Sequence, residues 1–173
     1  MTTTFSSLSP QEALQVAIYI EERNAGVYQR FAEMFTEFRD AESLEIASVF
    51  WDMSVEEKRH SSVLQNRYAE RYGEAQSSVT EEDVRELIEV PRLETGDVFA
   101  AMETGTAIPR QRALNVALQA EKSAQNFYAR LVGQTEDATL RQLYNELASM
   151  EDGHVTYLKG LLAAAATESQ EVH

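Results

Sequence analysis

Residues 17–28 read AIYIEERNAGVY and residues 117–128 read ALQAEKSAQNFY, so that Ala, Glu and Tyr recur at identical spacing. A second motif repeats as well, because EKRH at residues 57–60 and EDGH at residues 151–154 share the pattern Glu-x-x-His. Long amphipathic helices can resemble one another through composition alone. The repeated residues are acids and histidines, however, where a helical core would prefer Leu. We therefore predict two helical hairpins of the same design.

The composition of the chain favours an all-α fold. Its 173 residues include only seven Gly and three Pro, and long stretches are rich in Ala, Leu, Glu, Gln and Arg. A chain of this length buries roughly two thirds of the surface that its unfolded form exposes, so one domain is expected. The sequence contains no cysteine, which excludes disulfides, Fe–S clusters and thiolate-bound metals.

The helix signals predict a four-helix bundle. Ser9 and Pro10 are typical of a helix start, and this first helix should run to about residue 38. The second is expected from residues 40–42 to about residue 72, where Gly73 can end it. The third is expected from about residue 109 to 132. The fourth is expected from about residue 136 to 165, with Thr135 as its cap.

The segment between the two hairpins is predicted to be a crossover connection. Residues 73–108 are punctuated by Gly and Pro, and a Thr-Glu-Glu-Asp sequence at residues 80–83 should open a short helix within them. A connection of this length can pass from one end of a bundle to the other. We expect one domain over residues 1–166 and a mobile tail over residues 167–173, which lack apolar periodicity.

Acidic residues interrupt the apolar stripes of the predicted helices. Glu21 follows Leu14 and Ala17 at helical spacing, and Glu121 lies at the corresponding place of its own helix. Both Glu-x-x-His pairs, Glu57 with His60 and Glu151 with His154, also fall on the inward stripe, because positions three apart share a helix face. The neighbouring acids Glu22, Glu56 and Asp152 should be solvated.

Buried carboxylates of this kind require compensation by positive charge. An isolated buried charge is very costly, and the stripes offer no Lys or Arg beside these groups. Two divalent cations would supply four positive charges against four carboxylates. The sequence therefore predicts a site for two metal ions, whose ligands are Glu21, Glu57, His60, Glu121, Glu151 and His154.

Several of these residues have simpler interpretations, which stay open at this point. Each histidine could be a partly buried core residue that hydrogen-bonds a carbonyl or an acid. Tyr28 and Tyr128 are interpreted as core aromatics whose hydroxyls find partners, in preference to a redox role beside the site. The remaining aromatic residues of interest, expected to pack in the core, are Trp51, Phe31, Phe35 and Phe127.

Together these motifs resemble the rubrerythrin-like branch of the ferritin-like di-iron carboxylate superfamily, over most of residues 9 to 165. The resemblance implies that Glu57 and Glu151 bridge two iron ions. It also implies that Glu21 and Glu121 are terminal ligands and that each histidine binds one ion. Two features depart from the family. Ala124 stands where rubrerythrins proper carry a further carboxylate, and a cysteine-free chain cannot hold their rubredoxin module.

The chemistry that the resemblance implies is oxidation of Fe(II) by peroxide or dioxygen, with an external electron donor. Manganese or zinc would also accept the same ligands. Two alternatives remain: an iron-handling or storage-related protein, and a metal-free helical interaction module. The net charge of −14 argues against nucleic acid or an anionic membrane as partner. With neither a signal peptide nor a membrane span evident, we expect a cytoplasmic protein, and a homodimer.

Overall fold

The computed structural model describes residues 4–74, 79–88 and 109–171, and all regular structure in these ranges is helical, which confirms the all-α fold. The chain divides into two compact units, residues 1–89 and residues 90–173. The predicted crossover lies largely outside the described residues. The first unit contains the 3₁₀ helix η1 (Phe5–Ser7), α1 (Pro10–Phe38), α2 (Ala41–Tyr72) and α3 (Glu81–Leu87), and the second contains α5 (Pro109–Gln134) and α6 (Ala138–Glu171).

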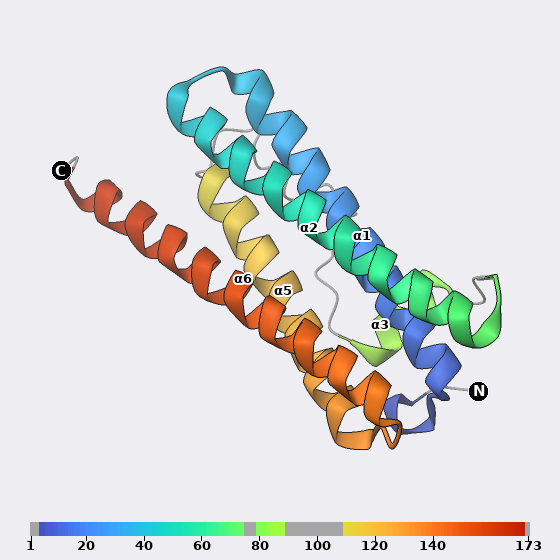
Figure 1. The fold of residues 1–173 in the computed structure, drawn as a ribbon. Coiled ribbons are helices and arrows are strands. Elements are labelled where there is room, and N and C mark those ends of the chain that lie inside the picture. The colour runs from blue at the N-terminus through green and yellow to red at the C-terminus, as the bar shows by residue number, and fades with distance from the viewer. Residues whose placement is uncertain (1–3, 75–78, 89–108, 172–173) are drawn as a thin grey trace. The chain divides into compact units, whose positions relative to one another are not determined.

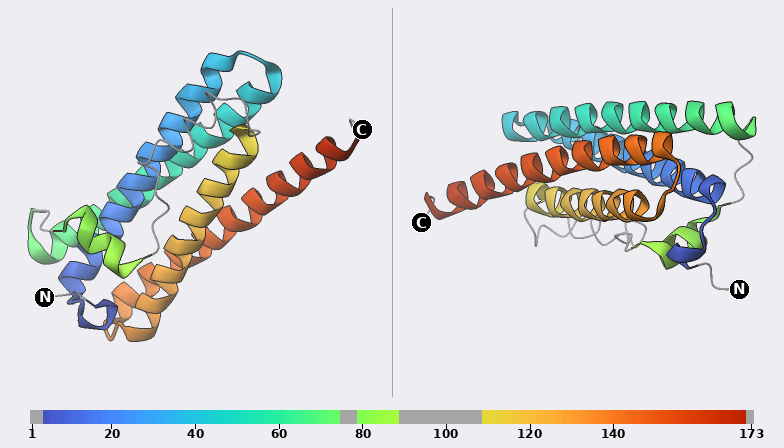
Figure 2. Two further views of the ribbon diagram at one scale, coloured as in Figure 1. Left: turned by 180° about the vertical axis from the view of Figure 1, so that it is seen from behind. Right: turned by 60° about the horizontal axis from the view of Figure 1, so that its bottom comes forward.

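The first unit is built on a hairpin of α1 and α2, which run side by side in Figures 1 and 2. Ser9 caps α1 as predicted: its hydroxyl accepts from the Glu12 amide at 3.2 Å, and the Glu12 carboxylate accepts from the Ser9 amide at 2.8 Å. Arg39 then adopts a left-handed conformation, with φ of 60°, and Asp40 caps α2. This two-residue connection makes the helices antiparallel neighbours.

The predicted end of α2 and the predicted start of the short helix are also confirmed. Gly73 follows α2 with a φ of 82°, a conformation that favours glycine, and its amide donates to the Ala69 carbonyl at 3.0 Å. Thr80 caps α3 and exchanges hydrogen bonds with Asp83, in the capping box that the sequence indicated.

The second unit is the hairpin of α5 and α6 (Figure 2). Its connection differs from the prediction, because Asp137 caps α6 by accepting from the Leu140 amide at 3.0 Å. The predicted cap, Thr135, instead donates its hydroxyl back to the Leu131 carbonyl. Helix α6 continues to Glu171, past the predicted end near residue 165, because its Ala-rich final turns contain no Gly or Pro to stop it.

Matching aromatic pairs fill the two hairpin cores. In the first, the fully buried Tyr28 ring stacks on Phe50 with centroids 6.1 Å apart. In the second, the equally buried Tyr128 ring stacks on Tyr144 at 6.2 Å. Phe50 and Tyr144 each lie seven residues before the Glu of their Glu-x-x-His pair. The sequence repeat is therefore a repeat of packing layers, and the assignment of both tyrosines to the core is confirmed.

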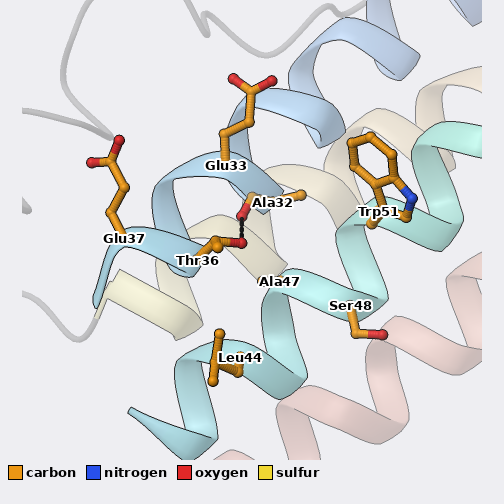
Figure 3. Close-up of a pocket in the computed structure, with 8 residues that line it drawn as sticks. All are labelled: Ala32, Glu33, Thr36, Glu37, Leu44, Ala47, Ser48 and Trp51. Atoms are coloured by element: carbon orange, nitrogen blue, oxygen red, sulfur yellow. Dashed lines mark hydrogen bonds between the residues drawn. The ribbon is translucent and has the colours of Figure 1, made fainter. Parts of the chain in front are cut away.

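Trp51 was wrongly assigned to the core, because its side chain is 51% exposed. It lies at the edge of a groove between α1 and α2, with Ala32 and Ala47 among the other lining residues (Figure 3). The Lys58 ammonium lies 6.0 Å from the indole centroid. Trp51 directly follows the buried Phe50, and one step along a helix turns a side chain by about 100°, away from the core.

Candidate metal centre

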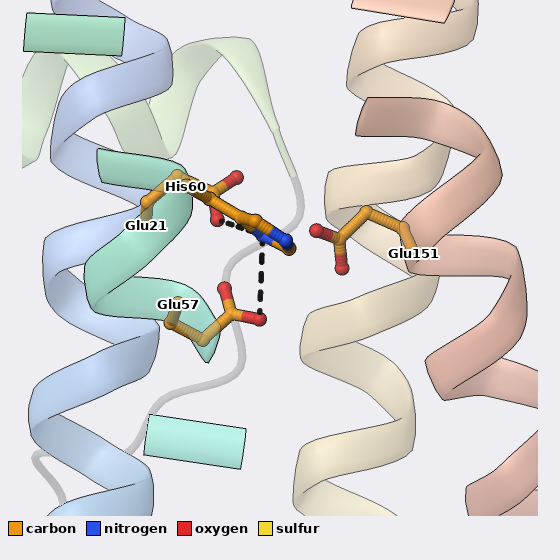
Figure 4. A group of neighbouring side chains, drawn as sticks. All are labelled: Glu21, Glu57, His60 and Glu151. Atoms are coloured by element: carbon orange, nitrogen blue, oxygen red, sulfur yellow. Dashed lines mark hydrogen bonds and ion pairs between the residues drawn. The ribbon is translucent and has the colours of Figure 1, made fainter. Parts of the chain in front are cut away.

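Three side chains of the first hairpin converge on one point. Glu21 comes from α1, and Glu57 and His60 come from successive turns of α2 (Figure 4). Both carboxylates are fully buried, and the His60 side chain is 9% exposed. His60 Nδ1 lies 3.1 Å from Glu21 Oε2 and 3.9 Å from Glu57 Oε1. We call these residues the first trio.

The second hairpin repeats this arrangement with Glu121 on α5 and Glu151 and His154 on α6. His154 Nδ1 lies 3.0 Å from Glu121 Oε2 and 3.7 Å from Glu151 Oε2. Both carboxylates are again fully buried, and the imidazole is partly buried. In this second trio, as in the first, the histidine meets the acid of the facing helix more closely than the acid of its own helix.

The spacing within each trio suits a shared metal ion. One ligand atom from each member of a trio lies within 4.8 Å of the other two. Nitrogen and oxygen ligands bind first-row metals at about 2.0–2.2 Å, so that two ligands of one ion are separated by roughly 3 to 4 Å. The same three side chains can therefore reach one ion after small movements, and their donor types are those that iron, manganese and zinc accept.

The second trio contains a carboxyl group whose pKa is raised by its surroundings. Burial, and next the Glu151 carboxylate beside it, raise the pKa of Glu121 to about 8, although its contact with His154 acts in the opposite direction. A carboxyl group with such a pKa holds its proton in neutral solution. A cation at this point would compete with the proton and favour the ionised form.

Lys and Arg are absent from the buried side chains in the described parts of the chain. The fully buried acids are Glu21, Glu57, Glu121 and Glu151. Within residues 4–74, 79–88 and 109–171, no Lys or Arg side chain is buried. Each imidazole lies within 3.9 Å of both carboxylates of its own trio.

The acids that were predicted to be solvated are confirmed as exposed. Glu22, Glu56 and Asp152 are exposed, so these sequence neighbours of the trio acids do not belong to either trio. Glu22 accepts a hydrogen bond from the Gln65 amide at 2.6 Å, and Asp152 accepts one from the Gln125 amide at 2.8 Å. The position of each acid around its helix therefore decides whether it is buried or exposed, as predicted.

One polar residue beside the first trio was not predicted from the sequence. Asn24 lies one turn after Glu21 on α1, and its side chain is only 3% exposed. The helical period could have found it, because positions 21, 24 and 28 share a face. Ala25, the next residue along α1, is also buried.

An all-α chain with a carboxylate–histidine trio in each of two hairpins defines the class of ferritin-like metal-site proteins. Within this class, the chain belongs to the rubrerythrin family, because the family model described as Rubrerythrin matches residues 12–107, more than half of its length. That match includes the first trio. None of the helices in the described ranges is long and apolar enough to cross a membrane.

A solved structure supports the same fold. The chain is similar to an uncharacterized conserved protein from Magnetospirillum magnetotacticum MS-1, with a TM-score of 0.71 and 22% sequence identity. The similarity covers 91% of this chain and 95% of the other. No curated protein matches the sequence. At this level of sequence identity, the similarity supports a shared fold and nothing further.

Proposed function

We propose that the two trios bind two iron ions and that the protein oxidises Fe(II) with peroxide or dioxygen. Membership of the rubrerythrin family supports this proposal, as does the repetition of one ligand set in both hairpins. Glu57 and Glu151 would each be a further ligand within their own trio. Glu21 and Glu121 would each be terminal ligands, and each histidine would bind one ion.

The observation that carries the proposal is the burial of four carboxylates without a buried Lys or Arg among the described residues. A folded protein that gained nothing from these acids would be more stable with apolar residues in their place. Two divalent cations would make the four carboxylates formally neutral. A metal-free interaction module, by contrast, gives no reason to keep them.

Bound iron supplies one-electron chemistry and open coordination positions for a small oxidant. The chain's own residues prepare the place for it. In each trio the histidine Nδ1 faces two carboxylates, so that this nitrogen must give up its hydrogen bond, and any proton it carries, for a metal ion to bind there. The carboxylates, as hard oxygen donors, can change binding mode as the charge of the ion changes.

The source of electrons is proposed to lie outside this chain. Its sequence contains no cysteine, so it provides no cysteine-bound iron centre that could pass electrons to the trios. We therefore propose an external donor, and we propose that the protein acts as a homodimer.

The function is tested by following Fe(II) oxidation after addition of peroxide, with absorbance of the Fe(III) product as readout. Wild-type protein should oxidise about two equivalents of Fe(II) per chain. Glu57→Ala and Glu151→Ala should remove most of this capacity, because each takes a ligand from one trio. Glu56→Ala is the matched control, since this residue is exposed beside Glu57. Equal capacity in all four proteins would refute the proposed reaction at these residues.

A further inference from the structure

Asn24 is a buried polar group without a hydrogen-bond partner for its amide nitrogen. Its Nδ2 atom is inaccessible to solvent, and no described residue accepts a hydrogen bond from it. Leaving a buried amide unsatisfied is costly, and most buried side-chain donors in folded proteins are paired. The position therefore calls for an acceptor that the described residues do not provide.

The contacts between α1 and α2 place Asn24 at the level of the first trio. On one side of it, the Ser54 hydroxyl donates to the Ala25 carbonyl at 3.0 Å. On the other side, His60 meets Glu21 at 3.1 Å. Glu57 lies between Ser54 and His60 on α2, just as Asn24 lies between Ala25 and Glu21 on α1. Asn24 and Glu57 are thus at matching heights of the antiparallel hairpin.

The sequence repeat shows that hairpin packing does not require an amide at this point. The residue equivalent to Asn24 in the second hairpin is Ala124, which is fully buried. The two trios thus contain the same residue types. The hairpins differ one turn after the glutamate of α1 or α5. One has a hydrogen-bond donor there, and the other has a methyl group.

We propose that Asn24 donates a hydrogen bond to a small anionic ligand bound at the metal ion of the first trio. This inference rests on the proposed function, because it presumes a metal ion between Glu21, Glu57 and His60. An amide suits the role since it offers a donor without a charge. The formal balance between four carboxylates and two divalent cations is then kept, whereas Asp at this position would add a fifth negative charge and repel an anion.

The probe for this inference is azide, a small anion whose binding to ferric iron produces a visible absorption band. Iron-loaded, oxidised protein is titrated with azide, and iron content is measured in the same samples. Asn24→Ala, which copies the second hairpin, should weaken azide binding by about tenfold or more, as loss of a hydrogen bond to a charged group does. Asn24→Asp should weaken it further. Iron content should stay at the wild-type value in both.

Ser54→Ala is the matched control, because it removes a buried hydroxyl from the neighbouring turn of the same hairpin. Its azide affinity should equal that of the wild type. The metal-free form of Asn24→Ala should melt no lower than wild type, since the amide it removes has no acceptor there. A clear loss of stability in that form would indicate a packing role and would contradict the proposal.

The remaining outcomes separate this inference from the proposed function. Unchanged azide affinity in iron-loaded Asn24→Ala would overturn the inference alone. Loss of iron from both Asn24 variants would also overturn it, because Asn24 would then retain metal and not the anion. Failure of wild-type protein to bind iron would overturn the proposed function, and this inference with it.

Discussion

His154 Nδ1 lies 3.0 Å from Glu121 Oε2, across the pair of helices that form the second hairpin. The same contact links His60 to Glu21 in the first hairpin at 3.1 Å. Because both members of each contact come from facing helices, the contact ties the hairpin together and also orients the imidazole toward the carboxylates. The residues proposed to bind metal thus already form an ordered set in each hairpin.

The stability of the metal-free protein should fall as pH rises through neutrality. In the unfolded chain Glu121 loses its proton near the ordinary value of 4.5, whereas in the folded chain its pKa is raised to about 8. Between these values the folded form holds a proton that the unfolded form has lost, so the free energy of unfolding decreases with pH. The contribution is complete below the unfolded pKa and is lost above about pH 8.

Glu121→Gln should flatten this dependence, because the amide does not titrate. The difference in unfolding free energy between the two ends of the range is expected to be on the order of a few kcal/mol in wild type. Urea unfolding at several pH values measures it, with Glu56→Gln as the exposed control. If Glu121→Gln keeps the wild-type slope, the raised pKa of Glu121 is not its cause.

Gly153→Ala should stabilise the protein without disturbing Glu151 and His154 on either side of it. Gly153 is exposed within α6, and a Cβ atom added to it meets no other group within 4 Å. Ala is favoured over Gly inside a helix by about 0.5–1 kcal/mol. Thermal unfolding should show a higher melting temperature at unchanged metal content. A lower melting temperature would mean that this turn of α6 needs its glycine.

Removal of a core tyrosine hydroxyl should leave metal binding intact. Tyr28 and Tyr128 are fully buried and stack on Phe50 and Tyr144, as packing residues do. Tyr28→Phe and Tyr128→Phe keep the rings, so each should cost about 1 kcal/mol of stability or less. Iron content and the initial rate of Fe(II) oxidation should equal those of wild type. A rate several times slower at full iron content would instead support a redox role.

The fold could be predicted because its signals are local. The cap at Ser9, the glycine that ends α2 and the capping box at Thr80 each act within one helical turn, and the structure confirms all three. Local signals did not suffice to identify the cap of α6. Thr135 and Asp137 are both plausible caps, and only the hydrogen bonds of the folded chain distinguish them.

The members of each trio could be predicted because an acid on an apolar stripe contradicts the pattern around it. Asn24 was missed because it shares its turn with Ala25, and a pattern of apolar residues favours the alanine. Trp51 was misplaced for the opposite reason: apolarity alone suggested burial, whereas its angular position on α2 directs it outward. In both cases the helical angle was more informative than the residue type.

The buried acids and histidines are proposed to bind metal, and the metal content of the protein is the clearest check on this proposal. Elemental analysis after anaerobic purification should find about two metal ions per chain in wild type. Glu57→Ala and Glu151→Ala should each lose metal, whereas Glu56→Ala and Asp152→Ala, which alter the exposed neighbours, should retain it. Wild-type metal content in both Glu57→Ala and Glu151→Ala would contradict the account.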